Sequence, residues 1–198
     1  MRTLAIAAVL AGTVATARAD GQVELVGGGA IPVSDDEYTD LVDNSATFGL
    51  RFASAAAPGV GAEGGLEFTP VSLDNEQVLG VDASAWRLRA LAGARGQWLV
   101  GGKGVVMMRI AAGADIAHYG LSGSPLGITV DESQTDVGLG IEAGLGLGVK
   151  LGKVVVGAQL ALPIALHFDD DDPMDAHDFD FEYTAVDVEM LFGVAATM

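Results

Sequence analysis

The sequence contains no cysteine. Without thiols the chain can form neither disulfides nor a zinc–thiolate site, and no N-terminal cysteine is present to carry a lipid. Basic residues are also few: 10 lysines and arginines stand against 27 acidic residues among 198, for a formal net charge of −17. Nucleic-acid binding needs a basic face, so this charge balance argues against a nucleic acid as partner.

Beyond residue 19 the sequence has no run of 18 apolar residues, which excludes a membrane-spanning helix there. The first residues differ from the rest. A short basic start, an apolar stretch over residues 4–15 and the A-x-A sequence Ala17-Arg18-Ala19 predict a cleaved secretory signal peptide over residues 1–19. A single domain is then expected over residues 20–198, with a net charge of −19 because two basic residues are removed.

Glycine is abundant, and its spacing is informative in the stretch GLGIEAGLGLGVKLG, residues 138–152. The dinucleotide-binding pattern G-x-G-x-x-G does not occur in it. Every glycine has an even number, whereas Val137, Leu139, Ile141, Leu145 and Leu147 have odd numbers. Strict period two predicts a β-strand with glycine on one face and aliphatic side chains on the other.

Segments of this kind recur eight times, and helical periodicity is not convincing anywhere. The predicted strands cover residues 21–32, 44–55, 60–71, 83–97, 104–118, 134–149, 153–167 and 181–197. The connections alternate between long polar ones (33–43, 72–82, 119–133 and 168–180) and short ones (56–59, 98–103 and 150–152). An even number of strands with this alternation predicts an all-β fold, an eight-stranded antiparallel up-and-down transmembrane β-barrel.

In each strand one face is uncharged and the other carries the ions. The charged face consists mostly of Gly and Ala with a few Arg and acidic residues, which suits a narrow interior better than a water-exposed surface. The aliphatic face would then contact lipid. The glycines of residues 138–148 are expected to leave room in the lumen for long arginines from other strands and to ease the curvature of a closed sheet.

The charges on the inner face predict a network of ion pairs, because unpaired charges in so narrow a space would be strongly destabilising. Within it, Glu67 is expected near Arg87, and Glu63 near Arg89. The predicted network consists of Glu24, Arg51, Glu63, Glu67, Arg87, Arg89, Arg95, Arg109, Asp115, Asp136, Glu142, Asp187 and Glu189. Eight strands enclose a space that side chains can fill, which favours a plugged lumen over a conducting one.

In strand number, loop alternation, inverted polarity and signal peptide, residues 20–198 resemble the small eight-stranded outer-membrane barrels of the OmpA, OmpX and OmpW kind. The resemblance implies a monomer in the outer membrane of a Gram-negative-type envelope, in contact with the lipid bilayer and inserted by the barrel-insertion machinery. Members usually end in an aromatic residue, whereas this chain ends GVAATM, with Phe192 further in. Larger members add a peptidoglycan-binding domain after the eighth strand, and none is expected here.

The expected aromatic girdle consists of Phe48, Phe68 and Trp86 on the loop side, with Trp98 on the turn side.

The surplus acids lie in the long connections, above all in HFDDDDPMDAHDFD, residues 167–180. A Ca²⁺ site there would use carboxylate oxygens, the ligands that Ca²⁺ prefers. Its ligands would be Asp169, Asp170, Asp171, Asp172, Asp175 and Asp178. No glycine or glutamate follows in EF-hand register, so a solvated acidic loop is the alternative, and no other cofactor is expected.

The sequence therefore favours a non-enzymatic integral outer-membrane protein that displays acidic extracellular loops, for envelope integrity, surface interaction or cation binding. Lipopolysaccharide is a candidate partner. One alternative is a lipid A-modifying enzyme, for which His118 with Ser122 or Ser124 would be needed, although the spacing does not match the H-x-S pattern of lipid A deacylases. The other is a narrow, porin-like transport pathway.

Overall fold

The computed structural model describes residues 21–33, 44–54, 59–71, 81–124, 129–168 and 181–198. The expected signal peptide, residues 1–19, and the acidic residues Asp169–Asp178 lie outside this part of the chain, so both stay predictions. No helix in the described part is long and apolar enough to cross a membrane.

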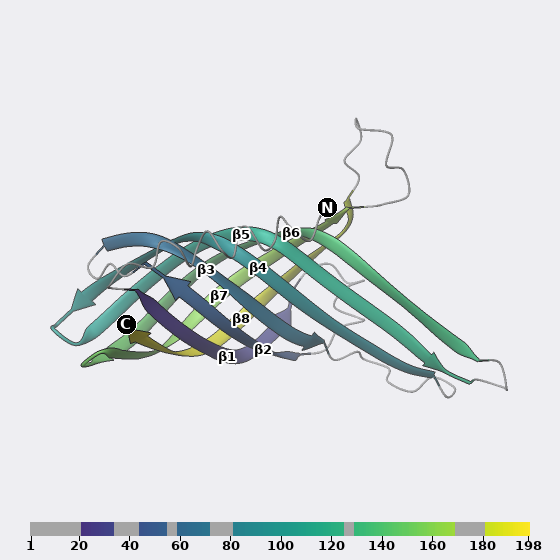
Figure 1. Ribbon diagram of the computed structural model, residues 1–198, viewed down its shortest axis with the longest axis horizontal. Coiled ribbons are helices and arrows are strands. Elements are labelled where there is room, and N and C mark those ends of the chain that lie inside the picture. The colour runs from purple at the N-terminus through teal and green to yellow at the C-terminus, as the bar shows by residue number, and fades with distance from the viewer. Residues whose placement is uncertain (1–20, 34–43, 55–58, 72–80, 125–128, 169–180) are drawn as a thin grey trace.

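Eight strands form one closed barrel in which every strand pairs antiparallel with its neighbours in sequence, and β1 closes the sheet against β8 (Figure 1). The strands are β1 (Gln22–Pro32), β2 (Ser45–Ala53), β3 (Gly59–Val71), β4 (Val81–Val100), β5 (Gly104–Gly123), β6 (Val130–Leu151), β7 (Val154–Phe168) and β8 (Phe181–Thr197). The predicted fold class and up-and-down strand order are confirmed.

Three strands, β4, β5 and β6, are five or six residues longer than predicted, and they protrude together from one end of the barrel (Figure 1). Residues 119–133 were expected to be a long loop, which is wrong for most of them. β5 runs to Gly123 and β6 begins at Val130, and the two strands stay paired to their ends. Among residues 119–123 and 130–133 only Leu121 and Val130 are aliphatic, so the apolar row that marks the other strands is missing, although the backbone ladder continues.

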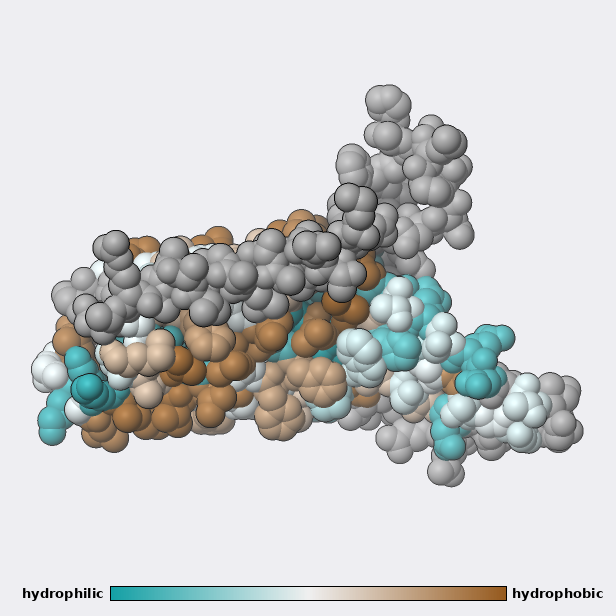
Figure 2. Space-filling model, viewed as in Figure 1, coloured by the Kyte–Doolittle hydropathy of each residue, from teal (hydrophilic) through white to brown (hydrophobic). Residues whose placement is uncertain are grey.

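Aliphatic side chains cover the outside of the barrel wall, and hydrophilic residues lie towards its two ends (Figure 2). Leu147, Val60 and Leu25 are 68%, 66% and 63% exposed. Such a surface is the reverse of a soluble barrel and is what contact with hydrocarbon requires. The lumen is not purely polar, since Val105, Met107, Val155 and Ala195 form a buried apolar cluster near its turn end, which the sequence did not predict.

Glycines act at two kinds of position in this wall. A Cβ at Gly144 would lie 2.9 Å from Cγ of Arg109, so this β6 glycine makes room for an arginine of β5, as the sequence predicted. Gly93 and Gly113 face the β4–β5 seam, where a Cβ would overlap a carbonyl oxygen of the neighbouring strand. Glycine is needed at such points because the strands bend sharply to close a narrow barrel.

Candidate functional site

The candidate site is the barrel lumen, into which every second residue of each of the eight strands points. Most of its charged side chains are almost inaccessible; Arg51, Asp115 and Glu142, for example, are 0% exposed. Twelve of the thirteen residues expected in the luminal network are buried there: Glu24, Arg51, Glu63, Glu67, Arg87, Arg89, Arg95, Arg109, Asp115, Glu142, Asp187 and Glu189.

Arg51 on β2 lies at the centre of the lumen and contacts groups on three other strands. Its Nε donates a hydrogen bond to Oε1 of Glu67 at 2.7 Å, and its Nη1 donates to Oε1 of Gln159 at 2.7 Å. Its Nη2 lies 3.4 Å from Oε1 of Glu142. Charge-assisted bonds of this kind are short and strongly directional, so they fix side chains from β2, β3, β6 and β7 in one arrangement.

Two further arginines enclose the same carboxylates. Arg89 on β4 pairs with Glu189 and lies 3.1 Å from Glu67, measured from Nη2 to Oε2. Arg109 on β5 pairs with Glu142, and its Nε lies 2.7 Å from Oε1 of Glu63. Each carboxylate of the central cluster therefore meets at least one guanidinium.

The network extends in both directions from this centre. Toward the turns, Nη1 of Arg95 donates to Glu24 at 2.6 Å, and Arg95 also contacts Glu63 at 3.2 Å. Toward the protruding end, Arg87 joins two strands, since it pairs with Asp115 at 2.8 Å and with Asp187 at 2.7 Å.

The pairing expected between β3 and β4 is wrong, by two residues at Glu67 and by four at Glu63. Glu67 lies opposite Arg89 in the ladder, not opposite Arg87, whose partner in the register is Thr69. Glu63 lies opposite Gly93 and pairs with Arg95 and Arg109 instead of Arg89. The parity of a residue gives its face, but the register depends on the stagger between strands, which the sequence pattern does not contain.

Asp136 does not join the buried network. It is half-buried at the rim, where Nε2 of Gln134 donates to its Oδ1 at 2.9 Å. The β6–β7 ladder begins only at Gly138 opposite His167. Asp136 therefore lies on the protruding part of β6, beyond the level at which the barrel closes, and this part of the network prediction is wrong.

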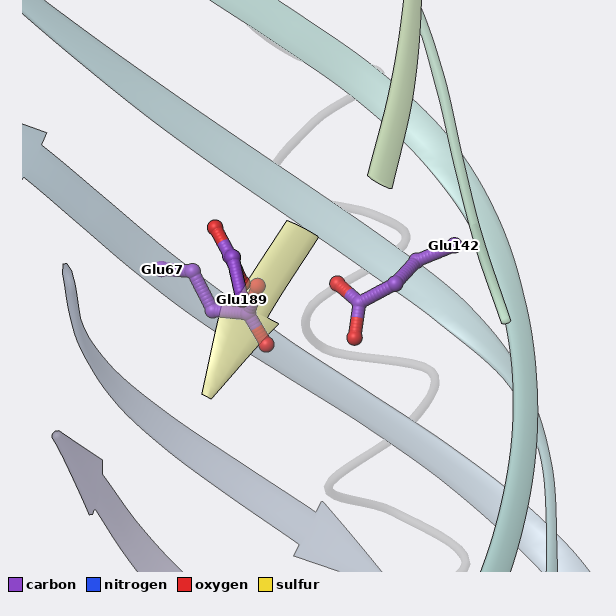
Figure 3. Close-up of side chains that lie close together, drawn as sticks. All are labelled: Glu67, Glu142 and Glu189. Atoms are coloured by element: carbon purple, nitrogen blue, oxygen red, sulfur yellow. The ribbon is translucent and has the colours of Figure 1, made fainter. Parts of the chain in front are cut away.

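Three carboxylates point toward one another across the lumen, from β3, β6 and β8 (Figure 3). Oxygen atoms of Glu67, Glu142 and Glu189 all lie within 4.8 Å of one another, close enough to share a metal ion. However, three arginines, Arg51, Arg89 and Arg109, contact the same oxygens. Because their charges balance those of the carboxylates, the geometry indicates an ion-pair cluster and not a cation site.

Several polar side chains of the lumen were not included in the predicted network. Gln159 bridges its parts, since it accepts from Arg51 and its Nε2 donates to Glu24 at 2.7 Å. His167 on β7 lies 3.2 Å from Asp115, and hydroxyls of Thr47 and Thr69 are 2.9 Å apart. Each of these residues lies on the inner face of its strand, to which every second residue belongs. The alternation along the strand could therefore have predicted their place, although they are not permanently charged.

On the outer surface, aromatic residues gather near the protruding end. Trp86 lies 6.2 Å from Phe68 and stacks on His118 at 5.1 Å, measured between ring centroids. Nδ1 of His118 and Oγ1 of Thr135 are within hydrogen-bond distance, at 2.8 Å. Ser122 is four residues further along β5, about 13 Å away, so the His–Ser contact that acyl-transfer chemistry needs is not formed by these two residues.

A closed barrel of eight antiparallel strands, aliphatic outside and filled with paired ions, defines the fold of the small outer-membrane β-barrels. This chain has that fold. The sequence matches no protein-family model and has no significant similarity to a curated protein.

Solved structures of three outer-membrane barrels are similar to it. Ail, the attachment invasion locus protein of Yersinia pestis, has 16% sequence identity and a TM-score of 0.55, with 91% of this chain and 99% of that chain covered. The Neisserial surface protein A has 10% identity and a TM-score of 0.54, with 90% and 97% covered. A major outer membrane protein from Thermus thermophilus has 12% identity and a TM-score of 0.54, with 90% and 98% covered. At these identities the likeness shows the fold alone.

Proposed function

We propose that the protein is a non-enzymatic integral outer-membrane barrel with a plugged lumen, and that it interacts with other molecules through the sheet that protrudes from its loop end. The aliphatic outer wall supports insertion in a bilayer, because lipid offers no hydrogen-bond partner and only a closed sheet leaves no free edge within it. The fold shared with outer-membrane proteins favours that membrane as the location.

The protruding sheet is the observation that carries the proposed interaction. The β3–β4 ladder ends at Val71 opposite Ala85, whereas the β4–β5 ladder continues to Val81 opposite Gly123. The β6–β7 ladder starts at Gly138, so residues 130–137 of β6 pair only with β5 among the residues that the structure describes. Within the described ranges, residues 130–137 therefore form an eight-residue strand edge with no neighbour beyond β5.

An exposed strand edge can accept an extended segment of another protein as an additional strand. The edge of β6 bears Asp131, Glu132 and Asp136, so it would favour a segment with basic side chains and repel a second copy of itself. Acidic residues on a strand edge can also serve only to prevent aggregation. A binding experiment must therefore distinguish recognition of a partner from this protective role.

The test uses the protein folded in phosphatidylcholine nanodiscs and a peptide of alternating threonine and lysine as the probe. We expect saturable binding that weakens with salt and falls at least about tenfold in the variant Asp131→Asn/Glu132→Gln/Asp136→Asn. Asp82→Asn, at the shorter free edge of β4, is the matched control and should bind as the wild type does. Equal binding by all three proteins, or none, would reject recognition at this edge.

The plugged lumen has its own test. The five buried arginines and seven buried carboxylates cross-link seven of the eight strands around the lumen, and Gln159 joins β7 to them, which supports a filled interior. We expect no conductance steps in planar bilayers. Regular steps would favour the alternative of a narrow transport pathway.

The acidic residues Asp169–Asp178 remain part of the proposal as a Ca²⁺ site on the same side of the membrane. Calorimetric titration of the folded protein with Ca²⁺ would support it if binding were saturable and lost on replacing these aspartates by asparagine.

A lipid A-modifying activity is the less favoured function, because Thr135 and Trp86 already engage the His118 ring. Unchanged acyl chains in lipid A from expressing cells would exclude it.

A further inference from the structure

All three lysines of the sequence lie at the turn end of the barrel, in or beside the hairpin turns that join β4 to β5 and β6 to β7. Lys103 is the last residue of the first turn, Lys150 lies in β6 just before the second turn, and Lys153 lies in that turn. The backbone N–H of Lys150 donates a hydrogen bond to the carbonyl oxygen of Lys103 at 2.8 Å, so the two turns are held side by side. We call these three residues the lysine patch.

The charges around the lysine patch are sorted by sign. Within the described part of the chain, every arginine is buried in the lumen and paired with carboxylates, which leaves the lysines as its accessible cations. None of the three lysines forms an ion pair with a described carboxylate. Of the acids that the structure describes, those nearest the turns, Glu24 and Glu63, face inward onto Arg95, whereas the exposed acids Asp82, Asp131 and Glu132 lie at the opposite end.

An apolar collar adjoins the lysine patch. Val100, Leu151 and Val149 are 56%, 58% and 47% exposed, and Trp98 is 38% exposed. The indole of Trp98 lies over Gly96, where a Cβ would overlap the ring. Tryptophan is enriched at the level of lipid headgroups, and lysine places its alkyl chain along apolar surface while its ammonium group reaches the polar boundary. The collar therefore puts the lysines at headgroup height.

We propose that the lysine patch binds the phosphate groups of anionic phospholipids in the membrane leaflet on the turn side. This inference rests on the proposed function, since it requires the barrel to be in a bilayer. Lysines near an anionic membrane surface attract it strongly, and the acidic protruding end of the chain would be repelled by it. The opposite charges at the two ends thus select both the lipid neighbours and the orientation of the barrel.

The two tryptophans allow each end to be probed separately. In a Trp86→Phe background Trp98 is the only tryptophan, and in a Trp98→Phe background only Trp86 remains. Each protein is folded into vesicles of phosphatidylcholine mixed with brominated phosphatidylglycerol or with brominated phosphatidylcholine, and the quenching of tryptophan fluorescence is compared. The ratio of the two quenching curves gives the relative binding of the anionic lipid next to that tryptophan.

We expect phosphatidylglycerol to be preferred at Trp98 by about fivefold or more at low salt, with the preference shrinking as salt is added. Lys103→Gln/Lys150→Gln/Lys153→Gln should lower the ratio to about one, and replacing the same lysines by arginine should keep it. Trp86 should show no preference for the anionic lipid. Equal quenching by both lipids at Trp98 would overturn the proposal, as would a preference that survives removal of the three charges.

Heat-modifiable migration in pure phosphatidylcholine vesicles is measured for each variant. If the wild type itself fails to insert, the proposed function fails. If all variants insert and the lipid preference is absent, only the lysine patch proposal fails.

Discussion

Arg51 is the residue on which the luminal network depends most visibly. Its guanidinium contacts Glu67, Glu142 and Gln159, and it is fully buried. Replacing it by methionine keeps much of the volume but leaves Glu67 without its nearest cation. Breaking a buried pair by removing one partner costs about 3–5 kcal/mol, so Arg51→Met should lower the urea midpoint of unfolding in vesicles substantially.

The pair itself can be separated from its surroundings by a double-mutant cycle. Because Arg51→Met/Glu67→Leu removes both charges, we expect it to be less destabilising than the sum of the single variants, with a coupling of about 0.5–3 kcal/mol. Asp131→Asn, exposed on the protruding sheet, serves as the surface control and should change stability by less than about 0.5 kcal/mol. Additive single variants would show that the two side chains do not interact.

Gly65 shows how a small residue serves this arginine. It lies opposite Arg51 in the β2–β3 ladder, and a Cβ there would be 2.9 Å from Cγ of Arg51. The sequence predicted that the glycines of residues 138–148 admit arginines; it did not predict this role for Gly65, nor which glycine faces which arginine. Parity is local information, whereas the partner of a residue depends on the stagger of whole strands.

At the scale of elements, the predicted strands were recovered wherever one face contacts the apolar surroundings and the other the lumen. The alternation comes from these two environments, and it ends where β5 and β6 extend beyond the closed part of the barrel. Residues 119–123 and 130–133 therefore read as loop although they continue the ladder. The sequence revealed the part of the barrel with an aliphatic outer face and missed its protruding sheet, which is the part we propose to be the interaction surface.

The β4–β5 pair offers an element-level prediction. A Cβ at Gly113 would overlap the carbonyl oxygen of Ala90 across the seam, and the contact is backbone, so no side chain can move to relieve it. Gly113→Ala should lower the fraction that reaches the heat-modifiable, folded form. Gly29→Ala is the control, because a Cβ there would meet its nearest atom at 3.8 Å, an ordinary contact, and it should fold as the wild type does. Equal yields for both variants would show that the seam is less tight than described.

At the scale of the whole molecule, the decisive property is whether the aliphatic rows face outward, toward lipid. Two positions on β6, one in the barrel wall and one on the protruding sheet, allow this to be tested. Leu145 and Ser133 lie on the same outer face of this strand, the first in the aliphatic wall and 60% exposed, the second on the protruding sheet. If the wall contacts hydrocarbon, Leu145→Arg should destabilise the folded barrel in lipid vesicles by about 2–4 kcal/mol, the cost of arginine near a bilayer midplane. Ser133→Arg should cost about 0–1 kcal/mol, because the protruding sheet stands in water or at the interface. Urea titrations followed by tryptophan fluorescence measure both values. A tolerated arginine at residue 145 would mean that water, not lipid, covers this face, and the inside-out arrangement on which every proposal above depends would be wrong.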